Sequence, residues 1–281
     1  MSNIVQLRQD IVFNARLAGL LDALKSIATQ QFQALERSFR SHGALFGAIQ
    51  TIAATLPLEQ LSHPYTQPDG KAGVIAVTSD TGLLGGLNQQ VISVAAQEYR
   101  RNPGELMVVG ERGLSYVKER KLTCKMFPGI LDSGRRALAG QVRDYALSQA
   151  LAGAFSSLTI VHPRALSFSA QRVEVLRALP CTVWLKTTPG RRPSSPVLLE
   201  SSTGSVLEYL VRLWLGQSLY EVFGMSRLAE LAARSMHLEG SAQELTRRGH
   251  KLKLKYFRER HEVIDRSMRE LFAARSLYAS N

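Results

Sequence analysis

The sequence predicts an α/β fold combined with a coiled coil: two long helices at the ends of the chain, with an α/β domain inserted between them. All ten prolines lie between Pro57 and Pro196, so both ends are free of proline. Apolar residues recur at helical spacing in both ends, and the middle alternates short apolar runs with helical stretches. We therefore expect an N-terminal coiled-coil helix over residues 1–56, an α/β domain over 70–190 and a C-terminal coiled-coil helix over 204–281.

The two proline-free ends can form long helices, because proline inside a helix costs roughly 3 kcal/mol. Near the start, the predicted apolar stripe comprises Leu17, Leu21, Leu24, Ala28 and Leu35, with Ile27 and Phe32 beside it and with Lys25, Gln30, Gln33 and Arg37 on other faces. Near the end, residues at or near heptad spacing are Leu228, Leu231, Leu238, Ala242, Leu245, Leu252, Tyr256, Val263 and Leu271. A C-terminal helix of this length reaches about 100 Å at 1.5 Å per residue. A helix this long is typical of a coiled coil, and the other end of the chain is its expected antiparallel partner.

The middle of the chain alternates strands and helices. Predicted strands are Lys71–Asp80, Leu106–Gly110, Leu158–Val161 and Val173–Leu179, and predicted helices are Asn88–Arg101 and Ala137–Ala154. This alternation favours a Rossmann-like domain with largely parallel strands. Thr187–Pro196 reads as a linker into the last helix.

Composition limits the classes of function. The formal net charge is +12 and the sequence pI is about 10. These values imply a negatively charged partner: nucleic acid, an acidic protein ring or anionic lipid. There is no long apolar span and no secretory signal, so we expect a cytosolic location or one on the cytosolic side of a membrane. Cys124 and Cys181 are far apart and are expected to be reduced, and neither a zinc site nor a cofactor is expected.

No motif supports catalysis. Ser79–Asn88 lies between a strand and a helix, where a phosphate loop would be, but it matches neither G-x-x-x-x-G-K-[ST] nor G-x-G-x-x-G. Gly82, Gly85 and Gly86 are better explained as residues that permit tight backbone turns. Arg247–His261 carries seven lysines and arginines against one glutamate. That run fits phosphate binding, a solvated coiled-coil face or a cationic shaft inside an acidic collar.

Three segments resemble the gamma subunit of F-type ATP synthases. The turn at Ser79–Asn88 is similar to that family's S-D-x-G-L-C-G-G-L-N, through Asp80, Gly82, Gly85, Gly86 and Asn88, with Leu84 where cysteine is usual. Val109–Gly113 resembles its V-G-x-x-G strand end. The most specific match is Leu219–Arg234, which resembles the family's L-Y-x-A-x-x-E-S-x-A-S-E-x-A-A-R through Leu219, Tyr220, Ser226, Glu230, Ala232, Ala233 and Arg234. Without a gap in the alignment, Tyr256–Met268 then falls on the family's Y-N-x-x-R-Q-x-x-I-T-x-E-[IL], in which Tyr256, Arg260 and Ile264 match. Departures at Phe257, His261, Asp265 and Ser267 favour a divergent gamma from an alternative synthase.

The resemblance implies a non-catalytic central rotor shaft that couples ion flow to ATP synthesis or hydrolysis. It implies as partners the alpha and beta subunits around the shaft, the epsilon subunit and the rotor ring of c subunits, with no nucleic acid. It further implies a peripheral position at the cytoplasmic face of a bacterial inner membrane. Residues implied to face the alpha/beta ring are Lys25, Arg234, Tyr256, Arg258, Arg260, His261, Ile264 and Asp265.

Two other interpretations remain open on the residues alone. A basic coiled-coil protein that binds nucleic acid predicts strong, salt-dependent binding to generic DNA. An α/β enzyme with helical arms predicts a turnover that no motif in the sequence identifies.

Overall fold

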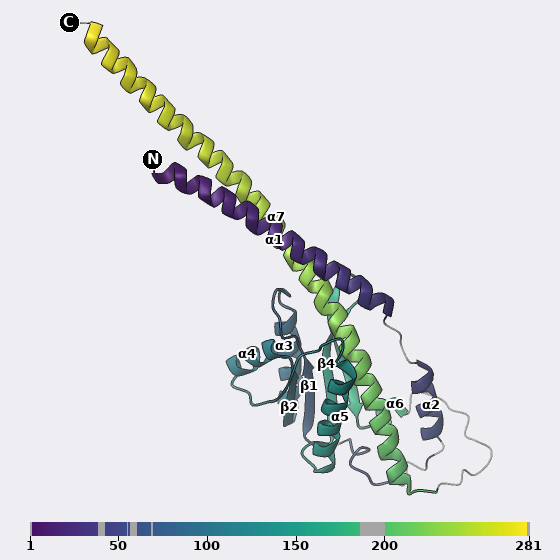
Figure 1. The fold of residues 1–281 in the computed structure, drawn as a ribbon. Coiled ribbons are helices and arrows are strands. Elements are labelled where there is room, and N and C mark those ends of the chain that lie inside the picture. The colour runs from purple at the N-terminus through teal and green to yellow at the C-terminus, as the bar shows by residue number, and fades with distance from the viewer. Residues whose placement is uncertain are drawn as a thin grey trace. The chain divides into compact units, whose positions relative to one another are not determined.

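A computed structural model describes residues 2–38, 43–54, 56, 61–68, 70–185 and 200–279 (Figure 1). The chain divides into two compact units. Met1–Thr29 and Ser235–Asn281 form one, here the paired-helix unit, and Gln30–Arg234 forms the other, here the sheet unit. The elements in chain order are α1 (Ser2–Ser38), α2 (Gly43–Ala53), β1 (Ala72–Val77), α3 (Leu87–Arg101), β2 (Pro103–Val109), α4 (Glu111–Glu119), β3 (Lys125–Phe127), α5 (Arg135–Leu151), β4 (Ser157–Ala165), β5 (Gln171–Leu179), α6 (Thr182–Leu185) and α7 (Thr203–Ala279).

The sheet unit is built on five strands in the order β3-β2-β1-β4-β5. The first four are parallel and β5 runs antiparallel to β4. This is the strand order of a doubly wound fold, and it confirms the predicted Rossmann-like domain with largely parallel strands. The sequence did not predict α4 or β3, and the latter has only three residues, too few to show a periodicity. The predicted linker Thr187–Pro196 lies outside the described residues.

Helices cover both faces of the sheet. Val74 and Ala76 of β1 pack with residues of α3 and α4, whereas Ile75 and Val77 pack with residues of α5 and α7. Because successive side chains of a strand point to opposite faces, a fully apolar strand such as β1 is buried on both sides. Within the sheet unit, α7 is therefore part of the core, and Leu207, Leu219 and Phe223 are fully buried.

In the paired-helix unit, α1 and α7 form an antiparallel pair. Thr29 Oγ1 lies 3.0 Å from Ser235 Oγ, Lys25 Nζ lies 3.4 Å from Glu239 Oε1, and the Asn14 amide donates to the Leu245 carbonyl at 2.6 Å. As the residue number falls along α1 it rises along α7, which is the signature of antiparallel helices. The predicted antiparallel coiled coil of the two ends is confirmed.

The seam of α1 differs from the predicted stripe. Side chains at heptad spacing are buried or half-buried, namely Ile4, Leu7, Ile11, Asn14, Ala18, Leu21, Lys25 and Ala28. Leu24 and Ile27, which were assigned to or beside the stripe, are 37% and 51% exposed. Lys25, which was assigned to another face, lies in the seam and pairs with Glu239. The prediction erred because α1 carries two apolar stripes, and the sequence alone does not say which of them meets α7.

Over the part of the chain that the structure describes, no helix is both long and apolar enough to cross a bilayer.

Candidate functional site

The glycine turn, residues 79–88, follows β1 at its carboxyl end and leads into α3. β1 lies between β2 and β4, which is where the strand order of the sheet reverses. In doubly wound folds, ligands bind in the crevice at this reversal. Here α7 packs against the turn: Leu84 and Leu87 form a buried cluster with Ala229 and Ala233.

Side-chain hydrogen bonds hold the glycine turn in shape. The Ser79 backbone N–H donates to Asn88 Oδ1 at 3.3 Å, and Asn88 Nδ2 donates to Ser79 Oγ at 2.9 Å. The Asp80 carboxylate accepts from the backbone N–H groups of Glu111 at 2.9 Å and Gly129 at 3.1 Å. Asp80 thus ties the loops that follow three neighbouring strands into one assembly, which explains why an acid is needed at this position.

Two residues of the turn adopt left-handed backbone conformations. Gly85 has a φ of 59°, as a tight glycine turn requires, but the second is Leu83, with a φ of 64°, rather than Gly82 or Gly86. The left-handed region is unfavourable for a residue with a Cβ, and such residues concentrate at functional sites. The Leu83 side chain is 50% exposed, so the strained turn presents an apolar group to the outside.

Glu230 of α7 is the centre of a buried ionic network at the turn. Its Oε1 accepts from Arg234 Nη2 at 2.6 Å and from Arg227 Nη1 at 2.8 Å, both on the same helix. The same oxygen accepts from Thr81 Oγ1 of the turn at 3.1 Å, and Arg234 also donates to that hydroxyl. Glu230 is only 7% exposed, so its charge depends on these donors. The network fastens the turn to the helix.

The contact between the turn and α7 leaves little free space. A cavity of about 10 Å³ remains between Ser79, Asn88, Ser226 and Glu230. Its volume suits a single water molecule and is too small for a phosphate group. Side chains of α7 thus lie against the glycine turn, beside the position where other doubly wound folds bind a dinucleotide.

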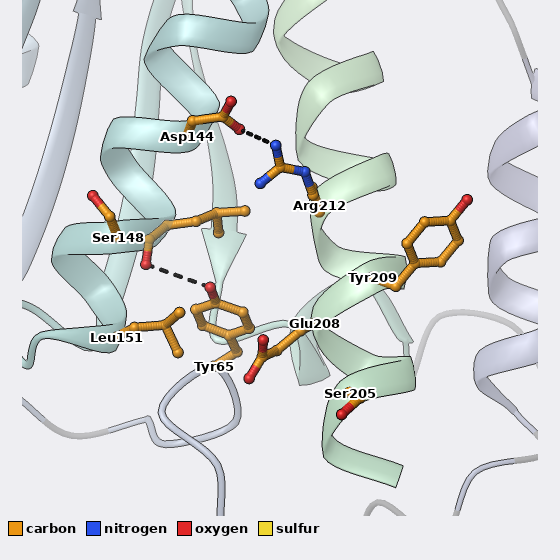
Figure 2. A pocket seen from close by; sticks show the side chains of 9 residues that line it. Tyr65, Asp144, Ser148, Leu151, Ser205, Glu208, Tyr209 and Arg212 are labelled. Carbon is orange, nitrogen blue, oxygen red and sulfur yellow. Dashed lines mark hydrogen bonds and ion pairs between the residues drawn. The ribbon is translucent and has the colours of Figure 1, made fainter. Parts of the chain in front are cut away.

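Helices α5 and α7 also contact each other beside a groove of about 360 Å³ in the sheet unit (Figure 2). This contact is called the α5–α7 joint below. Arg212 of α7 reaches Asp144 of α5 at 3.0 Å, and Arg143 donates to the same carboxylate at 2.7 Å. Glu208 lies 3.1 Å from His63 Nε2, and the Tyr65 hydroxyl at the floor donates to the Leu147 carbonyl at 3.4 Å. Each charged side chain that lines the groove therefore has an ionic partner, Asp144 with Arg212 and Glu208 with His63, which suits a structural contact.

The titration of these groups agrees with a structural role. The hydrogen bond from Arg143, aided by its charge and that of Arg212, lowers the pKa of Asp144. Burial raises the pKa of Tyr65 to about 12, and burial likewise raises the pKa of the Cys181 thiol to about 12. Both cysteines are free thiols in the structure. Among the described residues, no three His, Cys, Asp or Glu side chains are grouped so that they could hold a metal ion.

The residues expected to face a ring fall into separate groups. Arg234 joins the glycine turn through Thr81 and Glu230, and Lys25 pairs with Glu239 in the helix seam. Tyr256 is half-buried and its ring lies 5.7 Å from that of Phe257. The remaining five, which are exposed along one stretch of α7, are Arg258, Arg260, His261, Ile264 and Asp265.

Sequence reasoning did not assign Thr81, Leu83 or Glu230 to the site. The ion pairs of Glu230 could have been predicted from the sequence, because it stands four residues before Arg234 and three after Arg227, at the spacing of helical ion pairs. Nothing in the sequence distinguished Thr81, because its contact spans 149 residues of chain.

Comparisons with known proteins agree with this architecture. A family model described as ATP synthase matches residues 4–276. An ATP synthase gamma chain of Clostridium acetobutylicum is 26% identical over 260 residues, covering 90% of each chain. One of Ruminococcus albus is 24% identical over 283 residues, covering 98% of each. Among solved structures, a chain of the Euglena gracilis mitochondrial ATP synthase in an OSCP/F1/c-ring structure has a TM-score of 0.71 at 15% identity, covering 98% of this chain and 94% of its own. A family match over almost the whole chain, joined to this fold, shows that the chain belongs to the ATP synthase family.

Proposed function

We propose that this chain is the gamma-type central shaft of a rotary ATP synthase. The observation that carries the proposal is the paired-helix unit, in which an antiparallel coiled coil leaves large apolar side chains exposed on both helices. On α1 these are Val5, Val12, Phe13, Leu20, Leu24 and Ile27. On α7 they are Leu254, Phe257, Val263, Ile264, Met268, Leu271 and Phe272. The number of these side chains within one unit supports a protein interface there.

The partners around this unit are proposed to be the alpha and beta subunits. An asymmetric pair of helices inside a ring of similar subunits contacts each of them differently, and a ligand or partner shifts a conformational equilibrium only through such differential contacts. The basic side chains of residues 247–260 lie exposed on the same unit, where acidic groups of a ring would meet them. Contacts between exposed charges are weak and screened, which suits a shaft that must turn.

The sheet unit is proposed to contact the epsilon subunit and the rotor ring of c subunits, at the cytoplasmic face of a bacterial inner membrane. In this proposal the chain is not catalytic: nucleotide chemistry belongs to the beta subunits and ion transport to the membrane sector. The cavity between the glycine turn and α7 supports that division, since its volume of about 10 Å³ is too small for a phosphate group. The α/β domain over residues 70–190 and the C-terminal helix over 204–281 remain part of the proposal. The single N-terminal helix expected over residues 1–56 is corrected, since α1 ends at Ser38 and Ile49 and Ala53 of α2 pack in the core of the sheet unit.

The test is co-expression of this chain with the alpha and beta subunits of the same organism, followed by native mass measurement. We expect one copy of this chain with three copies of each partner. Phe13→Ser, Leu20→Ser and Ile27→Ser together should abolish capture. The matched control is Leu151→Ser, Leu166→Ser and Val175→Ser, three exposed apolar residues of the sheet unit, and it should leave capture intact.

A chain that purifies alone contradicts the shaft proposal. The exposed basic side chains of residues 247–260 would then favour the alternative that the chain binds nucleic acid. Binding to generic DNA that weakens steeply with salt would support that alternative.

A further inference from the structure

Asn14 places a polar side chain in the middle of an otherwise largely apolar seam. It occupies one of the heptad positions of α1 that face α7, between Ile11 and Ala18, and it is 7% exposed. A buried amide at such a position is costly unless it is hydrogen-bonded. Its Nδ2 donates to the backbone carbonyl of Leu245 at 2.6 Å.

The carbonyl of Leu245 is accessible because of Gly249. In an α-helix the carbonyl of residue 245 points toward residue 249, one turn further on. A Cβ placed at Gly249 would lie 3.0 Å from Asn14 Nδ2, so the amide would have to move by a few tenths of an ångström to accommodate it. The missing side chain thus forms a notch in α7 that the amide enters.

Among the neighbouring heptad positions of α7, the notch exists at Gly249 alone. One heptad before and after Gly249 stand Ala242 and Tyr256, both of which have a Cβ. A slip of one heptad, about 10 Å at 1.5 Å per residue, would face the Asn14 amide with either of these side chains. The amide would then be buried without an acceptor.

We infer that Asn14 and Gly249 together lock the axial register of the α1–α7 pair. The seam positions beyond Asn14 on α1 are Ile11, Leu7 and Ile4, and apolar heptads of this kind tolerate alternative registers. Among the residues that the structure describes, the other polar contacts across the seam, Lys25 with Glu239 and Thr29 with Ser235, lie more than ten residues further along α1. Asn14 therefore specifies the register of the end of the pair that those contacts do not control.

The register lock is a property of the chain alone, so its test needs no ring subunits. Spin labels are attached at Arg8→Cys and Lys255→Cys, exposed positions on the two helices, in the full chain with Cys124→Ala; Cys181 is fully buried. Pulsed electron paramagnetic resonance then measures the distance distribution between the labels. Hydrogen exchange of α1 measures how firmly the helices are paired.

We expect one narrow distance peak with Asn14 in place. Asn14→Leu, of similar size but apolar, should at least double the width of the distribution or add a second peak, while protection of α1 stays equal or increases. Gly249→Ala should broaden the peak as well. Gly240→Ala is the matched control, because a Cβ at Gly240 meets nothing within 4 Å, and it should leave the peak unchanged.

A single narrow peak in Asn14→Leu would overturn the inference, since packing alone would then set the register. Broadening accompanied by faster exchange of α1 would also overturn it, because the helices would be separating rather than slipping.

Discussion

At the scale of single residues, the glycine turn depends on a few side chains that act over long stretches of sequence. The Asp80 carboxylate accepts hydrogen bonds from the backbone N–H groups of Glu111 and Gly129, and the Glu230 carboxylate accepts one from the Thr81 hydroxyl of the turn. The sequence identified Asp80 and the glycines through a motif. It did not identify Thr81 or Leu83, whose roles follow from tertiary contact and backbone conformation.

Glu230→Ala should destabilise the sheet unit by roughly 3 kcal/mol, because removing the acid of a buried ion pair leaves arginines without their partner. The control is Glu98→Ala in the same unit, whose i,i+3 pair with Arg101 lies at the surface of α3 and which should cost no more than about 0.5 kcal/mol. Trp184 and Trp214 are the two tryptophans of the chain and both lie in the sheet unit. Urea unfolding followed by their fluorescence therefore reports this unit, and equal effects of the two substitutions would contradict a buried network.

Gly85→Ala should lower the stability of the sheet unit by about 1 kcal/mol, because a Cβ is unfavourable at a φ of 59°. The same substitution at Gly140, inside α5 with only ordinary contacts around its Cβ, should raise stability by about 0.5–1 kcal/mol. Denaturation midpoints of both variants check the opposite signs. A stabilising Gly85→Ala would show that the turn does not require the left-handed conformation.

At the scale of elements, the sequence was most informative where a pattern is long. The helices of the two ends, four of the five strands and the helices α3 and α5 were predicted from periodicity and from proline positions. The stripe predicted on α1 was right at Leu21 and Ala28 but wrong at Leu24 and Lys25, because apolar residues cover two faces of that helix. Only contact with α7 shows that Lys25 lies inward and that Ile27 lies outward. Element type is thus a local property, whereas orientation is a tertiary one.

The α5–α7 joint should make stability depend on pH. The pKa of Asp144 is lower in the folded chain than its ordinary value of 3.8, so the folded state favours the ionised carboxylate. Its contribution is present above pH 4 and is lost as the pH falls through the lowered pKa. Asp144→Asn should therefore lose less stability than the unaltered chain between pH 5 and pH 3, measured by urea unfolding. Identical losses would show that the ion pair with Arg212 and Arg143 contributes nothing.

At the scale of the whole molecule, α7 takes part in both compact units. Its first part, through Arg234, belongs to the sheet core, and its later part pairs with α1. From residue 261 to residue 273, every side chain of α7 is exposed. These residues add little to the stability of the isolated chain, so they are available to partners.

Removal of residues 261–281 should leave the melting temperature of the sheet unit within about 2 °C, because the side chains of residues 261–273 are all exposed and bury little surface. In the assembled synthase, the same truncation should reduce ATP-driven ion pumping in membrane vesicles by more than half. Pumping at the original rate would show that this end of α7 has no part in coupling. A large fall in melting temperature would instead indicate packing within the chain.

The two helices of the paired-helix unit lie far apart in the sequence, and this distance affects the order in which the parts of the chain fold. The hydrogen bond between Thr29 and Ser235 joins residues 206 positions apart. At a synthesis rate of roughly 5–20 residues per second, about 10–40 s pass between the emergence of α1 from the ribosome and the emergence of the part of α7 that pairs with it. All of the sheet unit is synthesised within that interval. The sheet unit can therefore fold before α1 pairs with α7, and until that pairing the apolar side chains of both faces of α1 remain exposed to solvent.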